Sequence, residues 1–143
     1  MAHEPFDKRI TPARPDLAAS HLRGKVEAAR FVEDEPATVV AGIAGIRPHP
    51  DSLASLDTQA LFGERCHVYE RRHGWAWVQL VRDDYVGYVQ ENALRMGGWR
   101  EANLRVVALR APVFSKADLK SPIGGFLPLN AEVTGESRSG DYV

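Results

Sequence analysis

The sequence predicts a mostly-β chain built from small antiparallel barrels or a sandwich, preceded by an extension. From Val26 onward, short runs of β-branched and aromatic residues alternate with clusters of Gly, Pro and Asp, and no helical periodicity spans them. The runs cover residues 31–32, 38–41, 66–69, 75–80 and 85–89. Many short strands separated by polar turns are typical of small barrels and sandwiches.

The composition of the chain argues against several kinds of partner and cofactor. The 143 residues are 44% hydrophobic and 26% charged, with a formal net charge of −1, which argues against a nucleic-acid or membrane partner. The single cysteine excludes an internal disulfide and a multi-cysteine zinc site, and the five histidines lack metal-ligand spacing. We therefore expect no cofactor and no metal. The first residues contain no apolar signal segment, so we expect a cytoplasmic protein.

Residues 1–36 are predicted to form the N-terminal extension, with one short helix over 15–23. Pro15 suits a first helical turn, Leu17, Ala18 and Leu22 share one helical face, and Gly24 ends the pattern. A helix this short is marginal alone, so we expect it to dock on the rest of the chain.

A weak internal repeat divides the remainder. Residues 39–41 (Val-Val-Ala) recur at 106–108, and residues 62–78 align with 127–143 without a gap. The first copy continues to Leu94, whereas the second has no counterpart of its last strand. An incomplete barrel exposes unpaired backbone groups. We therefore expect either a fragment of a longer protein or a missing strand supplied by a partner chain, as in a homodimer.

Three stretches resemble a bacterial SH3-like module: residues 58–64 (Thr-Gln-Ala-Leu-Phe-Gly-Glu), the hairpin at 74–75, and the ending 87–89 (Gly-Tyr-Val) followed by Leu94. With its lead-in segment 15–25, the chain resembles the N-terminal region of NlpC-type cysteine peptidases. These dipeptidyl-peptidase VI-like enzymes are γ-D-glutamyl-L-diamino acid endopeptidases that cut cell-wall peptides. The resemblance implies two tandem SH3-like barrels, a complete one over 37–96 and a truncated one over 103–143.

The resemblance also implies what the chain does. In the family, a catalytic domain follows the barrels and carries a cysteine in an Asp-Cys-Ser-Gly context with a downstream histidine, and neither occurs here. The chain is therefore expected to be inactive alone. Its implied role is to position the catalytic domain, its partner, and to narrow its specificity in the recycling of cell-wall peptides.

Glu64 and Tyr85 are the substrate-binding residues that the resemblance implies. In the family, an acid and a tyrosine of the first module help to hold the substrate's free α-amine. Glu64 matches the acid that closes the Gly-Glu motif, and Tyr85 matches the tyrosine before the Gly-Tyr-Val ending. Both side chains can accept hydrogen bonds from an ammonium, which would restrict substrates to short peptides with a free N-terminus. The alternative is a solvated turn glutamate and a tyrosine that packs in the barrel.

Cys66 is predicted to be a buried structural thiol. Its neighbour His67 points to the opposite face of the strand and cannot easily activate it. A following turn of three or five residues would place the apolar residues on one core face: Cys66, Val68, Ala76, Val78 and Leu80.

The aromatic side chains of this hairpin then lie on its outer face. They either pack beneath the second barrel or the N-terminal helix, or they form a peptide-binding surface.

The sequence also allows two rival functions. One is a stand-alone module that binds peptide or cell-wall ligands through Tyr69, Trp75, Trp77 and Tyr88. The other is an assembly module that pairs through its open barrel edge.

Overall fold

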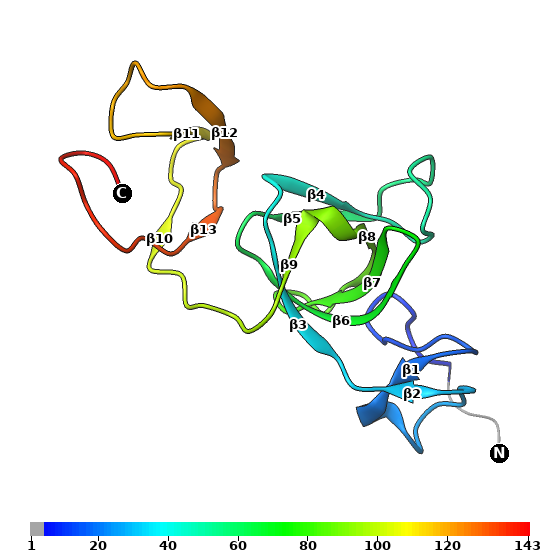
Figure 1. The fold of residues 1–143 in the computed structure, drawn as a ribbon. Coiled ribbons are helices and arrows are strands. Elements are labelled where there is room, and N and C mark those ends of the chain that lie inside the picture. Colours follow the sequence, from blue (N-terminus) through cyan, green and yellow to red (C-terminus); the bar gives the residue numbers. More distant parts are fainter. Residues whose placement is uncertain (1–4) are drawn as a thin grey trace.

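The computed structural model describes residues 5–143, and these residues are mostly β, as the sequence predicts (Figure 1). In chain order the elements are β1 (Ala18–Ala19), the 3-10 turn η1 (Ser20–Leu22), β2 (Phe31–Val32), β3 (Glu35–Val39), β4 (Ile43–Ile46), β5 (Thr58–Leu61), β6 (Arg65–Arg72), β7 (Trp75–Leu80), β8 (Val86–Gln90), η2 (Glu91–Ala93), β9 (Leu94–Met96), β10 (Leu104–Arg105), β11 (Arg110–Phe114), β12 (Ile123–Pro128) and β13 (Glu132–Val133). Among the described residues, no helix is long and apolar enough to cross a bilayer.

The centre of the molecule is a five-stranded antiparallel sheet in the order β8-β7-β6-β3-β9 (Figure 1). The hairpin β4–β5 forms a separate two-stranded sheet, and Arg47 after β4 joins it to β8 by exchanging two backbone hydrogen bonds with Tyr88 at 2.9 and 2.8 Å. The two sheets enclose one apolar core of small and branched side chains. In residues 5–143 the strands curl around this core without closing into one continuous ladder.

The β6–β7 hairpin confirms the predicted core face but not the predicted turn. The turn contains only two residues, His73 and Gly74, both with positive φ (51° and 79°). An even turn alone would put core-facing residues of β6 opposite outward-facing residues of β7. A β-bulge at Tyr69 shifts the register, however, so that Val68 pairs with Val78. All five residues predicted to share the core face are indeed buried there.

The helix predicted over 15–23 is wrong: only the single turn η1 forms. Leu17 and Ala18 are buried in two different clusters, on opposite sides of an extended backbone, which one helical face could not achieve. Tertiary backbone bonds hold the extended form, including Ala18 N–H to the Arg30 carbonyl at 3.0 Å and Ala29 N–H to the Pro15 carbonyl at 2.9 Å. These bonds outweigh the weak helical preference of so short a segment.

The second half repeats the strand pairing of the first. β3 pairs with β6 and β4 with β5 in the first copy, whereas β10 pairs with β13 and β11 with β12 in the second. Val39 exchanges backbone hydrogen bonds with Gly63 and Glu64, and Val106 does so with residues 130–131. The position equivalent to Gly63 is Asn130, and both have positive φ (89° and 70°).

This pairing corrects the gapless alignment of residues 62–78 with 127–143. Phe62 donates its N–H to the Gly42 carbonyl, and the same bond in the second copy runs from Leu129 to Leu109. Phe62 is therefore equivalent to Leu129 rather than Leu127. The shorter match of 39–41 with 106–108 agrees with this register.

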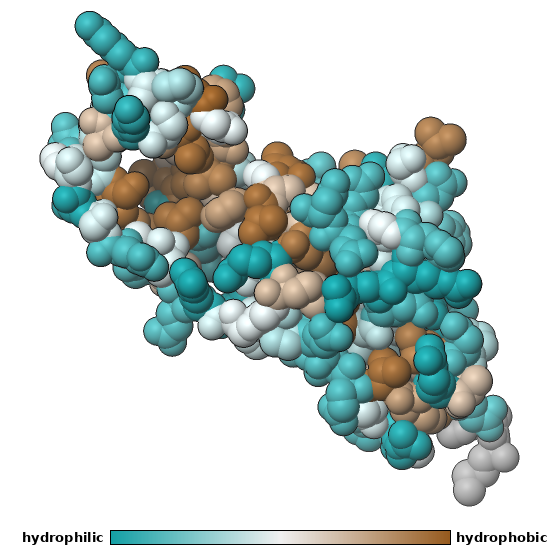
Figure 2. Space-filling view, viewed as in Figure 1, coloured by the Kyte–Doolittle hydropathy of each residue, from teal (hydrophilic) through white to brown (hydrophobic). Residues whose placement is uncertain are grey.

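The second copy has no described counterpart of β7 and β8, and it leaves many apolar side chains exposed. Figure 2 shows brown, hydrophobic residues around a hollow in this part of the molecule. Val107 and Leu109 are each 86% exposed and Leu119 is 76% exposed. Within residues 103–143, the structure thus shows two two-stranded pieces and no closed barrel.

Candidate functional site

Glu64 lies in the turn between β5 and β6, and its side chain folds back onto that turn. One carboxylate oxygen accepts the Leu61 N–H at 2.6 Å. The other, Oε1, lies 3.4 Å from Nε of Arg82 and is buried without a hydrogen bond. The side chain is only 11% exposed, so the alternative of a solvated turn glutamate is wrong. A buried carboxylate oxygen without a hydrogen bond is costly and favours a donor.

Glu64 borders a cavity of about 400 Å³ between the two repeats. The cavity takes most of its lining from charged and polar side chains of both copies: Leu61, Glu64, Arg65, Val81, Arg82, Arg105, Asn130 and Glu132. Arg105 and Glu132, cross-strand neighbours on β10 and β13, form an ion pair in its wall at 3.7 Å. The lining therefore carries three guanidinium groups and two carboxylates.

Tyr85 does not line this cavity. Its ring packs partly against the main core, and its N–H donates to Oδ1 of Asp83 at 3.2 Å. Loss of hydration, followed by the charge of Asp57, raises the pKa of Tyr85. Within the described residues, no hydrogen bond or ion pair joins Tyr85 to Glu64. The charged groups that act on the Tyr85 phenol are Asp57, Arg9, Asp7 and Asp83, and Glu64 is not among them.

Cys66 is fully buried, as predicted. Its Sγ lies 3.7 Å from the Ala37 carbonyl oxygen, and burial, with the nearby charge of Glu64, raises the pKa of the thiol to about 12. His67 points away, to Oδ2 of Asp34 at 2.7 Å. No group of His, Cys, Asp and Glu residues within 5–143 is arranged to hold a metal ion.

The outer aromatic face of the hairpin is covered by the N-terminal extension. Tyr69 and Trp77 are only 8% and 4% exposed, in a cluster with Leu17 of the extension. The packing interpretation is thus confirmed for these two side chains, with the extension as the covering element. Trp75 stays partly exposed at the rim.

Arg14 of the extension anchors this contact, and the sequence analysis missed it. Its guanidinium lies 4.5 Å above the centre of the Trp77 ring, pairs with Glu70 at 2.8 Å and donates to the Tyr88 hydroxyl at 3.0 Å. Arg14 lies well before the first expected strand at residues 31–32, so it carries no local signal of such a role.

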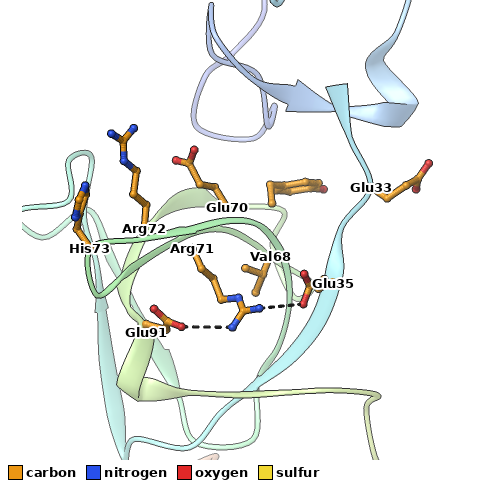
Figure 3. Close-up of a pocket in the computed structure, with 9 residues that line it drawn as sticks. Glu33, Glu35, Val68, Glu70, Arg71, Arg72, His73 and Glu91 are labelled. Atoms are coloured by element: carbon orange, nitrogen blue, oxygen red, sulfur yellow. Dashed lines mark hydrogen bonds and ion pairs between the residues drawn. The ribbon is translucent and has the colours of Figure 1, made fainter. Parts of the chain in front are cut away.

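A further charged cavity lies beside β6 (Figure 3). There the Arg71 side chain reaches between Glu35 and Glu91, with ion-pair distances of 3.5 and 3.4 Å. Figure 3 shows Glu70 and Arg72 pointing to the other side of the strand. The charges at Arg71 are already balanced by their neighbours, so this cavity does not call for a ligand.

Comparison with known proteins supports the resemblance over part of the chain. Residues 46–94 match the family model of the bacterial dipeptidyl-peptidase SH3 domain. This stretch contains Glu64, Arg82 and Tyr85. No curated protein matches the chain. The resemblance inferred from the sequence is thus confirmed for an SH3-like region over residues 46–94.

Among solved structures, the chain is similar to two NlpC proteins from Trichomonas vaginalis. For NlpC2 the identity is 14% and the TM-score 0.39, with 72% of this chain and 38% of that chain covered. For NlpC1 the identity is 13% and the TM-score 0.39, with 69% of this chain and 35% of that chain covered. The chain therefore spans well under half the length of either protein.

Proposed function

We propose that this chain, which carries an SH3-like domain related to that of bacterial dipeptidyl-peptidases, is the accessory part of an NlpC-type endopeptidase that acts on cell-wall peptides. In this proposal the two repeats are tandem SH3-like barrels, the second incomplete, and a separate catalytic domain is their partner. The proposal places the enzyme in the recycling of cell-wall peptides in the cytoplasm. The chain's own role is to restrict substrates to short peptides with a free N-terminus.

The observation that carries this proposal is the state of the Glu64 carboxylate. The Leu61 N–H fixes one oxygen, while the other is buried without a hydrogen bond beside a cavity. Arg82 already lies 3.4 Å from this oxygen but gives it no hydrogen bond, and an ammonium group would supply both the hydrogen-bond donor and a positive charge. A free α-amine therefore suits this position, whereas an acylated amine does not.

Tyr85, which lies with Arg82 in the connection between β7 and β8, is proposed as an auxiliary acceptor. Its hydroxyl would add one hydrogen bond to the amine or to the neighbouring peptide group. Replacing Tyr85 by Phe removes only that oxygen, so we expect a loss of affinity of about threefold to tenfold.

Calorimetric titration with L-alanyl-D-glutamine tests the amine site, because its side-chain amide stands in for the γ-glutamyl bond. We expect the wild-type chain to bind the free peptide and to lose about tenfold or more in affinity for the N-acetylated form. Glu64→Gln should remove this preference, whereas Glu35→Gln, in an exposed ion pair, should keep it. Equal binding of both peptides by the wild type would refute the amine site.

Cys66 offers no nucleophile in this proposal because its thiol is enclosed in the core. The pure chain should leave muropeptides uncleaved. Hydrolysis by the chain that disappears in Cys66→Ala would contradict the accessory role.

A second candidate function is assembly through the open edge of the second copy. The exposed apolar residues Val107, Leu109 and Leu119 favour it. Light scattering at rising concentration distinguishes the candidates, since a strict monomer removes the case for pairing between chains.

A further inference from the structure

We infer that the Glu64 cavity binds a ligand carrying both an ammonium and a carboxylate, and that Arg82 changes its partner from Glu64 to the ligand's carboxylate on binding. The inference rests on the proposed function. It adds the acidic group of the substrate and the residue that recognises it.

The described ion pairs of Arg82 are both long. Its Nε lies 3.4 Å from Oε1 of Glu64, whereas charge-assisted hydrogen bonds are about 2.7–2.9 Å long. Its other ion pair, with Asp83, is longer still at 3.7 Å. The side chain is 54% exposed and lies in the turn between β7 and β8. Because the Arg82 side chain is half exposed and makes no short charge-assisted hydrogen bond to Glu64, it can change its partner.

The charges around the cavity favour a ligand with both signs. Three guanidinium groups face two carboxylates, so an ammonium alone would increase an existing excess of positive charge. A carboxylate on the same ligand cancels that increase. The volume of about 400 Å³ lies within the range of about 300–1,000 Å³ that is usual for small-molecule sites.

The other two arginines have partners other than Glu64. Arg105 lies 3.7 Å from Glu132, its cross-strand neighbour, and Arg65 lies 5.7 Å over the Trp99 ring. Only Arg82 pairs with the carboxylate that the ammonium would take. When the ammonium occupies Oε1, the Arg82 guanidinium becomes free to bind the ligand's carboxylate through two donors. Glu64 stays compensated before and after binding, which avoids an unpaired buried charge.

The test compares L-alanyl-D-glutamine, which has a free α-carboxylate, with its α-amide by calorimetric titration. We expect the wild-type chain to prefer the carboxylate form by about tenfold. In Arg82→Gln this preference should disappear, because the variant lacks the guanidinium that binds the ligand's carboxylate. The variant also lacks the group that competes with the ligand's ammonium for Glu64. The α-amide should therefore bind Arg82→Gln more tightly than it binds the wild type.

Two further variants keep the result interpretable. Arg82→Lys keeps the charge but loses the planar fork, so its preference should be intermediate. Arg71→Gln removes an arginine from the separate cavity beside β6 and should keep the wild-type preference. Unchanged amide spectra for each variant show that the fold is intact.

The outcomes separate this inference from the proposed function. If N-acetylation weakens binding but Arg82→Gln keeps the tenfold preference for the carboxylate form, the amine site stands and the exchange by Arg82 is refuted. If N-acetylation has no effect, the amine site itself is refuted. If the wild type binds neither peptide at millimolar concentration, both fail.

Discussion

Glu64 and Cys66 lie close together at the start of β6, yet their surroundings give them opposite chemistry. Cys66 faces the apolar core, where a neutral thiol is favoured. Glu64 keeps one oxygen on the Leu61 N–H and the other near a guanidinium, so its charge is compensated. β6 thus contributes a buried thiol to the core, and the turn before it contributes a carboxylate to the cavity.

The pH dependence of stability should show the buried thiol. Burial raises the pKa of Cys66 from 9.0 to about 12, so the unfolded chain releases this proton at lower pH than the folded chain. Stability should therefore fall as the pH rises above about 9, by about 1.4 kcal/mol per pH unit from this group. Urea unfolding at about pH 8 and about pH 10 measures the effect.

Cys66→Val is the matched control for that experiment, because it fills a similar volume without an ionisable group. The loss between the two pH values should be smaller in Cys66→Val by the contribution of the thiol. Equal losses in both proteins would show that the thiol is not protected by burial.

The burial of a residue could be predicted from the sequence where it depends on neighbouring residues, and could not be predicted where it depends on contacts between distant segments. The burial of Cys66 follows from strand alternation, a local property. The burial of Glu64 depends on a turn that folds back on Leu61 and on Arg82 from a distant turn. The resemblance seen in the sequence indicated Glu64 as a candidate, but only the structure shows that its Oε1 is buried without a hydrogen bond.

Among the elements, the β6–β7 hairpin differs from the prediction in two ways, the length of its turn and the presence of a bulge. The two differences offset each other, so the predicted core face is still correct. The sequence analysis expected an odd turn, and the structure has an even turn with a bulge at Tyr69. Both give the same inward face below the bulge. The apolar pattern therefore determined which side chains are buried, whereas the turn type was settled by the His73-Gly74 pair.

Gly87 should be required where β8 meets the β4–β5 hairpin. A Cβ at this position would lie 2.5 Å from Cγ2 of Ile46 and 3.0 Å from the Arg47 carbonyl oxygen. Gly87→Ala should therefore lower the free energy of unfolding by about 1–3 kcal/mol through overpacking. Gly98→Ala is the control, since nothing lies within 4 Å of its added Cβ. Equal stability of the two variants in urea would contradict the close approach.

Arg14 should decide whether the extension stays docked. Arg14→Met keeps some apolar contact with Trp77 but loses the ion pair with Glu70, which we expect to cost about 1–2 kcal/mol locally. Hydrogen exchange of the Ala18 and Ala19 amides should become about tenfold faster.

Arg9→Met is the control for this prediction. The Arg9 side chain is 73% exposed and pairs only with nearby Asp7 among the described contacts. Its removal should leave the exchange of the extension unchanged. If Arg14→Met behaves like Arg9→Met, the extension is held by its apolar cluster alone.

For the whole molecule, the internal repeat explains both the fold and the single candidate site. The position equivalent to Glu64 in the second copy is Ala131, which is fully buried and carries no charge. The first copy therefore supplies the carboxylate whose Oε1 is buried without a hydrogen bond, while the second contributes Arg105 and Glu132 to the cavity wall. The site thus depends on both copies, although its proposed amine-binding acid comes from the first.

The repeat was visible in the sequence only where it is most similar. The Val-Val-Ala pair marks the correct register, but the gapless match of the following segment is shifted by two residues. Gly63 and Asn130 are equivalent because both tolerate positive φ, which is a conformational rather than a chemical likeness. An alignment by residue type alone could not detect that equivalence.

The most direct test of the account is to map where the peptide binds. In a ¹H–¹⁵N titration of the full chain with L-alanyl-D-glutamine, the Leu61 amide, which donates to Glu64, should show the largest saturable shift, together with the Arg82 side chain. Shifts centred instead on the Trp75 indole, with Leu61 unmoved, would contradict the account and favour the aromatic surface as the binding site.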